Sequence, residues 1–198
     1  MPPGAQMSEW VTQFVGSVPP FDDFMGLMGN DFFIPVTMCL ILLGLWAGHP
    51  DPTRREHLQR TVINASIAIG ISSLALYLIN IHDFWPRPYE LLESASQAMQ
   101  TLHYPSLDPS FPSNVATISF AAATGVWLGH RKAGIVLYVL ASIWALSRFY
   151  AGMHFFVDIA GGAAIGVLTG FIISKVLMPR TEPIPTLALR LARFLYIA

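Results

Sequence analysis

The chain has 198 residues, of which 54% are hydrophobic and only 12% are charged, and its net charge is −1. Soluble domains carry about 25% charged residues, so the composition excludes an ordinary soluble protein and indicates one embedded in a membrane. The near-neutral charge offers no basic surface to nucleic acid, and the single cysteine, Cys39, excludes an internal disulfide. The length suits one domain over residues 1–198, and we expect neither a metal site nor a cofactor.

The N-terminal part predicts an interfacial helix and then the first membrane span. Residues 8–18 mix apolar and polar side chains over too short a length to cross a bilayer, and the proline pair 19–20 is expected to end this helix. A loop that contains Asp22 and Asp23 follows. The first span is expected at 32–48, slightly shorter than the ~20 residues that a span needs.

Further apolar runs predict an all-α integral membrane bundle of five or six transmembrane helices with interfacial helices. The four spans after the first are expected at 61–81, 113–128, 133–146 and 155–177. A polar loop is expected at 49–60, and an extracytoplasmic loop with a short amphipathic helix at 82–112. Three glycines four residues apart, at 162, 166 and 170, predict a smooth stripe for close helix contact.

The tail at 183–198 is expected as an interfacial helix, because Arg190 and Arg193 near its middle disfavour crossing; a partial sixth span is the alternative. Alternation of the spans collects nine basic residues on one side of the membrane: Arg54, Arg55, Arg60, Arg131, Lys132, Lys175, Arg180, Arg190 and Arg193. The other side holds only Arg87 and Arg148. The positive-inside rule then predicts that these two face outward from a cytoplasmic membrane of the bacterial type.

The segment 147–158 carries the strongest chemical signal, because Arg148, His154 and Asp158 lie in an otherwise apolar stretch. On a helix, His154 and Asp158 would share one face, so the carboxylate could hold one imidazole nitrogen as N–H and free the other to attack an electrophile. Arg148 supplies a planar fork of donors that suits phosphate oxygens. A lone histidine is usually just a polar interfacial residue, but three ionisable groups near lipid are costly and favour phosphoryl transfer.

Two further segments are expected on the same outer side. Arg87-Pro88 offers a second guanidinium, which alone could equally contact a lipid headgroup. Ser113 and Asn114 follow a proline at the start of a span, where free backbone N–H groups can bind an anion; an ordinary helix cap is the alternative. Convergence of the three segments on one membrane face favours a phosphate site.

These residues resemble the type 2 phosphatidic acid phosphatase superfamily of membrane lipid phosphatases. The family motifs are Lys, six residues, Arg-Pro; then Pro-Ser-Gly-His; then Ser-Arg, five residues, His, three residues, Asp. The third motif is complete from Ser147 to Asp158, and Arg87-Pro88 and Pro112-Ser113 match halves of the other two. The Lys position is Asn80, and the second-motif Gly-His becomes Asn114-Val115.

The resemblance implies a helical bundle that dephosphorylates membrane lipid phosphates or diphosphates without a metal, through a phosphohistidine. It implies His154 as the nucleophile and Asp158 as the residue that orients it. It also implies that Arg87, Ser113 and Arg148 bind the phosphoryl group; Asn114 is expected beside them. Undecaprenyl phosphates, phosphatidylglycerol phosphate, phosphatidate and lipid A all remain possible substrates, and the oligomeric state is open.

The family histidine that protonates the leaving oxygen is Val115 here, which leaves three hypotheses. The protein prefers a diphosphate, whose leaving group needs little protonation; or His103 or His82 acts as the acid, with Asn80 as a weaker donor in place of the Lys. In the third, the protein binds or transports lipid phosphates without hydrolysing them. Phosphate release from a lipid substrate separates the first two from the third.

Overall fold

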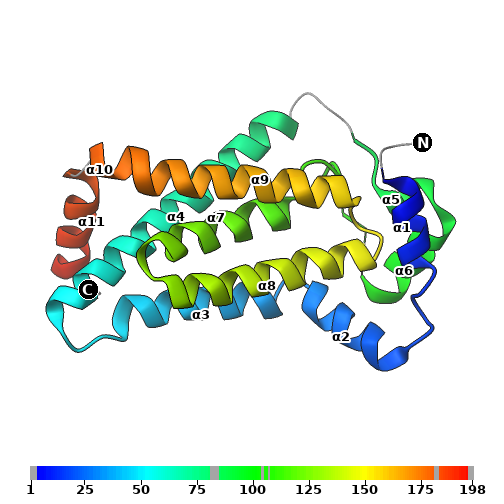
Figure 1. Ribbon diagram of the computed structural model, residues 1–198, viewed down its shortest axis with the longest axis horizontal. Helices are drawn as coiled ribbons and strands as arrows, with labels where there is room; N and C mark the ends of the chain where they lie inside the picture. Colours follow the sequence, from blue (N-terminus) through cyan, green and yellow to red (C-terminus); the bar gives the residue numbers. More distant parts are fainter. Residues whose placement is uncertain (1–3, 81–84, 104, 107, 181–182, 196–198) are drawn as a thin grey trace.

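The computed structural model describes residues 4–80, 85–103, 105–106, 108–180 and 183–195. Every regular element within these ranges is helical (Figure 1). The elements are α1 Ala5–Thr12, α2 Pro19–Gly29, α3 Phe33–Ala47, α4 Pro52–Asn80, α5 Pro88–Leu91, α6 Glu93–Leu102, α7 Asn114–Gly129, α8 Arg131–Tyr150, α9 Phe156–Ile172, the π-helical turn Ile173–Leu177, α10 Met178–Arg180 and α11 Pro183–Phe194.

Helix α7 forms the centre of the bundle and packs against α4, α8 and α9. Its closest partner is α9, where the predicted glycine stripe lies. A Cβ on Gly162 would approach the Ser113 carbonyl oxygen to 2.5 Å, and one on Gly166 would approach the Thr117 carbonyl oxygen to 2.3 Å. The stripe therefore lets two helix backbones lie closer than any side chain would permit, which confirms the packing role that the sequence predicts.

The prediction of an all-α membrane bundle is confirmed. Within the described residues, α4, α8 and the continuous segment 156–180 are each long and apolar enough to span a membrane. Helices α2 and α3 pass the same criterion together, with a bend of 52° between them, which gives three to four candidate spans by length and composition among the described residues, fewer than the expected five or six. Helix α7 has only 16 residues, and a shorter length suits it because protein rather than lipid surrounds it.

Two expected loops are helical, and both predictions are wrong for the same physical reason. The proline pair 19–20 begins α2, so the expected loop around Asp22 is helical, and the expected helix at 8–18 is instead α1, which ends at Thr12 rather than at the prolines. Pro52 likewise begins α4, after Asp51 accepts a hydrogen bond from the backbone N–H of Arg54 (2.8 Å). Proline suits the first helical turn because its missing N–H would have no partner there.

The two ends of the bundle differ in character (Figure 1). The α8–α9 turn lies with α5, α6 and α1 at one end, and the start of α4, the α7–α8 turn, α10 and α11 lie at the other. Helix α11 runs across the bundle end and contacts α4 instead of lying along the bundle, and its interfacial position stays a prediction. The basic segments that the alternation groups together therefore share one end of the molecule.

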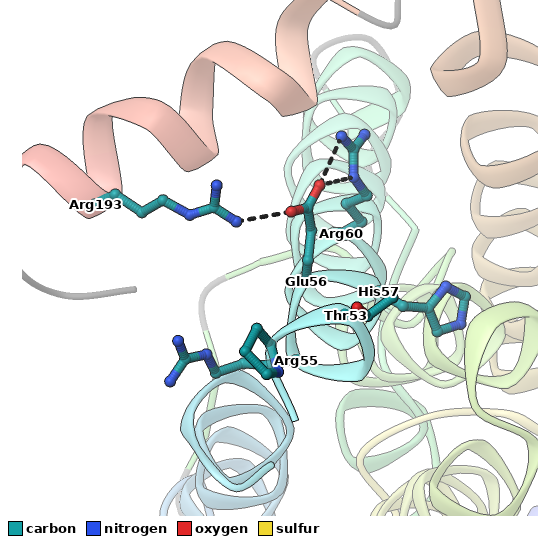
Figure 2. Close-up of a pocket in the computed structure, with 7 residues that line it drawn as sticks. Thr53, Arg55, Glu56, His57, Arg60 and Arg193 are labelled. Atoms are coloured by element: carbon teal, nitrogen blue, oxygen red, sulfur yellow. Dashed lines mark hydrogen bonds and ion pairs between the residues drawn. The ribbon is translucent and has the colours of Figure 1, made fainter. Parts of the chain in front are cut away.

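Charged side chains hold α11 to α4 (Figure 2). The Glu56 carboxylate of α4 forms ion pairs with Nη2 of Arg60 in the same helix (3.1 Å) and with Nη2 of Arg193 in α11 (2.8 Å). These residues line a cavity of about 530 Å³ together with Arg55 and His57. Both ion pairs are exposed to solvent, where water and salt screen them, so they hold the two helices together only weakly.

We predict that Gly166→Ala lowers the midpoint of thermal unfolding in detergent by several degrees. The added methyl would meet the backbone of α7 at 2.3 Å, and overpacking of this kind costs about 1–3 kcal/mol. Gly70→Ala in α4 is the matched control, since a Cβ there meets nothing within 4 Å and alanine favours the helix. Equal midpoints for the two variants would contradict a tight α7–α9 contact.

Candidate active site

A cavity of about 460 Å³ lies where α4 ends and α7 begins. Three sequence-predicted phosphate ligands, Arg87, Asn114 and Arg148, line it together with His154. The remaining lining residues are Asp31, Leu76, Tyr77, Asn80, Ser106, Asp108, Pro109 and Val115. Segments far apart in the sequence thus meet at one place, as a single phosphate site requires.

His154 lies in the turn between α8 and α9 and is 2% exposed. Gly152 makes the turn possible, since its φ is +70° and a Cβ there would lie 2.7 Å from the Ala95 carbonyl oxygen. The imidazole Nδ1 lies 2.9 Å from the carbonyl oxygen of Ser110. A carbonyl only accepts, so Nδ1 carries the hydrogen and Nε2 keeps its lone pair, 3.5 Å from Nη1 of Arg87.

Asp158 lies beside the imidazole but bonds to its supports. Its Oδ2 is 4.0 Å from Nδ1 of His154 and accepts hydrogen bonds from Ser110 Oγ (2.5 Å) and the Phe155 backbone N–H (2.7 Å). The carboxylate therefore fixes Ser110, whose carbonyl oxygen bonds the imidazole, and Phe155, which follows His154 in the chain. Sequence reasoning missed Ser110, because it belongs to no recognised spacing and has no local signal beyond the proline before it.

Arg87 is held by carbonyl groups as well as by a carboxylate. Its guanidinium donates to the backbone oxygens of Asp108 (2.9 Å) and Met153 (2.8 Å), and pairs with the Asp108 carboxylate at 3.0 Å. Glu90 accepts from the Arg87 backbone N–H at 3.1 Å, which closes a capping box on α5. The fork is thus fixed beside His154 by local backbone geometry.

Arg148 lies in the last turn of α8, is 5% exposed and forms an ion pair with Asp31. Asp31 lies between α2 and α3, at the bend of the broken helix pair. The two guanidinium groups of the cavity each face a carboxylate, so the unliganded site is close to electrical neutrality. Sequence reasoning did not anticipate either of these acidic partners, because Asp31 and Asp108 lie far along the chain from the arginines they meet.

The other predicted residues take less direct positions. Ser113 is buried and caps α7, accepting from the Ala116 backbone N–H at 3.4 Å. Asn80 lines the cavity, and its Oδ1 is buried with no hydrogen-bond partner among the described residues. His103 lies behind the α2–α3 bend, close to Gly29, and is not among the described cavity-lining residues. His82 lies outside the described residues.

The electrostatics keep the imidazole neutral. Burial, together with the charges of Arg87 and Arg148, lowers the pKa of His154 to about 3. Burial and the charge of Arg148 lower the pKa of His103 to about 4. Burial raises the pKa of Asp108, but the hydrogen bond from Ser106 and the charge of Arg87 outweigh it and leave that pKa below its usual value. A neutral imidazole with a free lone pair beside two cations can attack phosphorus.

Comparison with known families assigns the chain. A sequence profile described as the PAP2 superfamily matches residues 61–182, which is more than half of the chain. The chain belongs to the PAP2 superfamily. This confirms the resemblance that Arg87-Pro88, Pro112-Ser113 and the segment 147–158 carry.

Several bacterial proteins are similar to this PAP2 chain. Undecaprenyl-diphosphatase BcrC of Bacillus subtilis (strain 168) is 30% identical, over 69% of this chain and 66% of that protein. Bacitracin transport permease protein BcrC of Bacillus licheniformis is 28% identical, over 72% and 67%. The putative undecaprenyl-diphosphatase YbjG of Escherichia coli (strain K12) is 29% identical, over 71% and 66%. The match thus spans about two thirds of each relative.

The fold has a solved counterpart. The transmembrane PAP2-type phosphatidylglycerolphosphate phosphatase from Bacillus subtilis superposes with a TM-score of 0.50 at 19% identity, over 85% of this chain and 83% of that one. At this identity the likeness concerns the fold, an integral membrane helical bundle.

We predict that the pH dependence of stability reports the neutral imidazole. The folded state binds its proton to His154 only near pH 3, whereas an unfolded histidine binds near pH 6.5, so stability falls as the pH falls below 6.5. The slope is at most about 1.4 kcal/mol per pH unit. Thermal unfolding of His154→Asn between pH 7 and 4.5 should show a smaller decline than the unaltered protein. His49→Asn, in the loop at the other bundle end, is the control, and parallel curves for all three would contradict the prediction.

Proposed function

We propose that this protein removes the terminal phosphate from a membrane lipid diphosphate through a phosphohistidine on His154. The observation that carries the proposal is the fixed tautomer: the Ser110 carbonyl holds Nδ1–H, and Nε2 faces Arg87 in a cavity that Arg148 also lines. Nucleophile and cations are therefore preorganised before a substrate arrives, and such preorganised charge is usually the largest source of catalysis.

In the first step, Nε2 attacks the terminal phosphorus, a nitrogen–phosphorus bond forms and the bond to the bridging oxygen breaks. Arg87 and Arg148 bind the equatorial oxygens, whose negative charge the transition state distributes. Asn80 and Asn114 supply hydrogen bonds from the cavity wall, and Ser113 holds the start of α7 in place. In the second step, water attacks phosphorus, the nitrogen–phosphorus bond breaks, and phosphate leaves.

The substrate class follows from two independent arguments. Val115 lines the cavity and cannot donate a proton, so leaving groups that need little protonation are favoured, and a lipid phosphate is a far better leaving group than a lipid alkoxide. Two similar proteins carry the name undecaprenyl-diphosphatase, one of them as putative. We therefore propose an isoprenoid diphosphate, with the cavity on the extracytoplasmic side because the basic segments lie at the opposite bundle end.

A second candidate function is binding or transport of lipid phosphates without hydrolysis. The observation that favours it is again Val115, since an apolar side chain stands where a proton donor would face the substrate. Chemistry separates the two candidates, because only an enzyme releases inorganic phosphate.

We predict that His154→Ala reduces phosphate release from undecaprenyl diphosphate in detergent by at least about 10³-fold, since no other described imidazole lines the cavity. Asp158→Asn should cost less, about 10–10²-fold, because this side chain positions Ser110 and Phe155 and does not attack phosphorus. His49→Ala, remote from the cavity, is the matched control. Full activity in His154→Ala would refute the phosphohistidine.

We also predict that Val115→His raises the rate on undecaprenyl phosphate at least about tenfold and the rate on the diphosphate much less. A proton donor at this position helps the alkoxide leaving group most, and general acid catalysis is typically worth about 10²–10⁴-fold. The measurement is the ratio of the two rates in the variant and in the unaltered protein. Val115→Phe controls for the change in cavity shape, and an unchanged ratio in Val115→His would contradict the leaving-group argument.

A further inference from the structure

A lipid phosphate leaves with little protonation, but a proton donor in the cavity would also help poorer leaving groups, and the cavity contains several titratable groups. Among the described residues that line it these are Asp31, Tyr77, Arg87, Asp108, Arg148 and His154. The imidazole is the nucleophile, and guanidinium groups do not give up a proton in proteins. A phenol, with an ordinary pKa of about 10, is protonated at neutral pH and is a poor base for the second step, whereas a carboxyl group can both give and accept a proton. The two carboxyl groups are therefore the candidates for a general acid.

Asp108 holds Arg87 in place and is therefore not the candidate for the general acid. It pairs with Arg87 at 3.0 Å, accepts a hydrogen bond from Ser106, and its backbone oxygen binds the same guanidinium. Its pKa lies below the usual value, so it stays ionised and holds the arginine fork. Asp31 differs in how its arginine is held: backbone oxygens fix the Arg87 fork beside Asp108, whereas Arg148 pairs with the Asp31 side chain.

The residues on either side of Asp31 fix its position at the α2–α3 bend. The Asn30 side chain accepts hydrogen bonds from the backbone N–H groups of Phe32 (2.8 Å) and Phe33 (2.7 Å). These bonds fix the start of α3, which begins two residues after Asp31. Gly29 lets this bend press on α8, since a Cβ there would lie 2.5 Å from Nε2 of His103 and 3.3 Å from Cβ of Ser147. The residue after Ser147 is Arg148, so the approach brings the two charges together.

The same bend faces the start of α7. Met28 and Ile34, three residues on either side of Asp31, pack in one apolar cluster with Val115. Asp31 and Val115 also line the same cavity. The Asp31 side chain is 39% exposed, so water can exchange protons with it.

We propose that Asp31 is the general acid and base of this site, a role that rests on the proposed phosphatase function. A phosphate bound between Arg87 and Arg148 brings a second negative group beside Asp31, and two such groups in one site favour sharing a proton between them.

The proton balance closes over the two steps. As the bond between His154 Nε2 and phosphorus forms and the phosphorus–oxygen bond breaks, the Asp31 carboxylic acid gives its proton to the leaving oxygen. The Asp31 carboxylate then accepts a proton from the attacking water as the oxygen–phosphorus bond forms and the nitrogen–phosphorus bond breaks. The carboxylic acid is restored, and phosphate leaves.

The test is Asp31→Asn, assayed in single-turnover experiments on two substrates that share one lipid chain: an alkyl phosphate and a nitrophenyl phosphate. Nitrophenolate leaves without a proton, whereas an alkoxide does not. We expect the rate of the first step to fall at least about 10²-fold on the alkyl phosphate and less than about tenfold on the nitrophenyl phosphate. The nitrophenyl substrate should then leave phosphorylated His154 accumulated, because the base for the second step is missing.

Asp108→Asn is the matched control, since it makes the same chemical change at the other arginine-paired carboxylate. It should slow both substrates equally, as expected of a residue that only positions Arg87. Equal losses on both substrates in Asp31→Asn, while the unaltered protein hydrolyses them, would overturn the role of Asp31 alone. No phosphate release by the unaltered protein from either substrate or from undecaprenyl diphosphate would overturn the proposed function and this role with it.

Discussion

The close contact between α7 and α9 is the constraint on which the site depends. Gly162 brings the α9 backbone against the Ser113 carbonyl, and next to this contact the Ser113 backbone N–H donates to the Asp158 carbonyl oxygen at 3.0 Å. That bond joins the start of one helix to the start of the other. The Asp158 side chain then fixes Ser110, and the Ser110 carbonyl fixes the tautomer of His154. The packing of α7 against α9 thus sets the orientation of the His154 imidazole through a chain of hydrogen bonds.

Charge pairing explains how two buried arginines persist at this depth. Removing a guanidinium from water costs several kcal/mol unless partners replace the lost solvation. Arg87 obtains two carbonyl oxygens and the Asp108 carboxylate, and Arg148 obtains Asp31. The two pairs differ in consequence: the backbone bonds would keep Arg87 in place when a phosphate binds, whereas the known side-chain partner of Arg148 competes with that phosphate. A site built this way is stable when empty and still offers two cations to an anion.

The sequence predicts the helical bundle and the convergence of Arg87, Arg148 and His154 because both follow from local signals. Apolar runs, glycines at a four-residue interval and the spacing from Ser147 to Asp158 can each be read without knowing the fold. The helical starts at Pro19 and Pro52 were also readable, since proline favours a first turn, but their polar surroundings suggested loops. Ser110, Asp31 and Asp108 could not be found in this way. Their roles come from contacts across 117 residues in the case of Asp31 with Arg148, and 48 in the case of Ser110 with Asp158, and no local pattern encodes such pairs.

The position of the cavity also fits a substrate that is half lipid. Its wall includes Leu76 and Tyr77 near the end of α4, and the neighbouring side chains Leu74 and Leu78 are 53% and 56% exposed. In a bilayer such exposed apolar residues face acyl chains, where they cost nothing. A diphosphate held between Arg87 and Arg148 would therefore have an apolar path along α4 for its chain, without withdrawing that chain from the membrane. Exposing apolar surface to water costs about 25 cal/mol per Å², and a lipid chain that stays in the membrane avoids this cost during both binding and release. The arginines then need only recognise the headgroup.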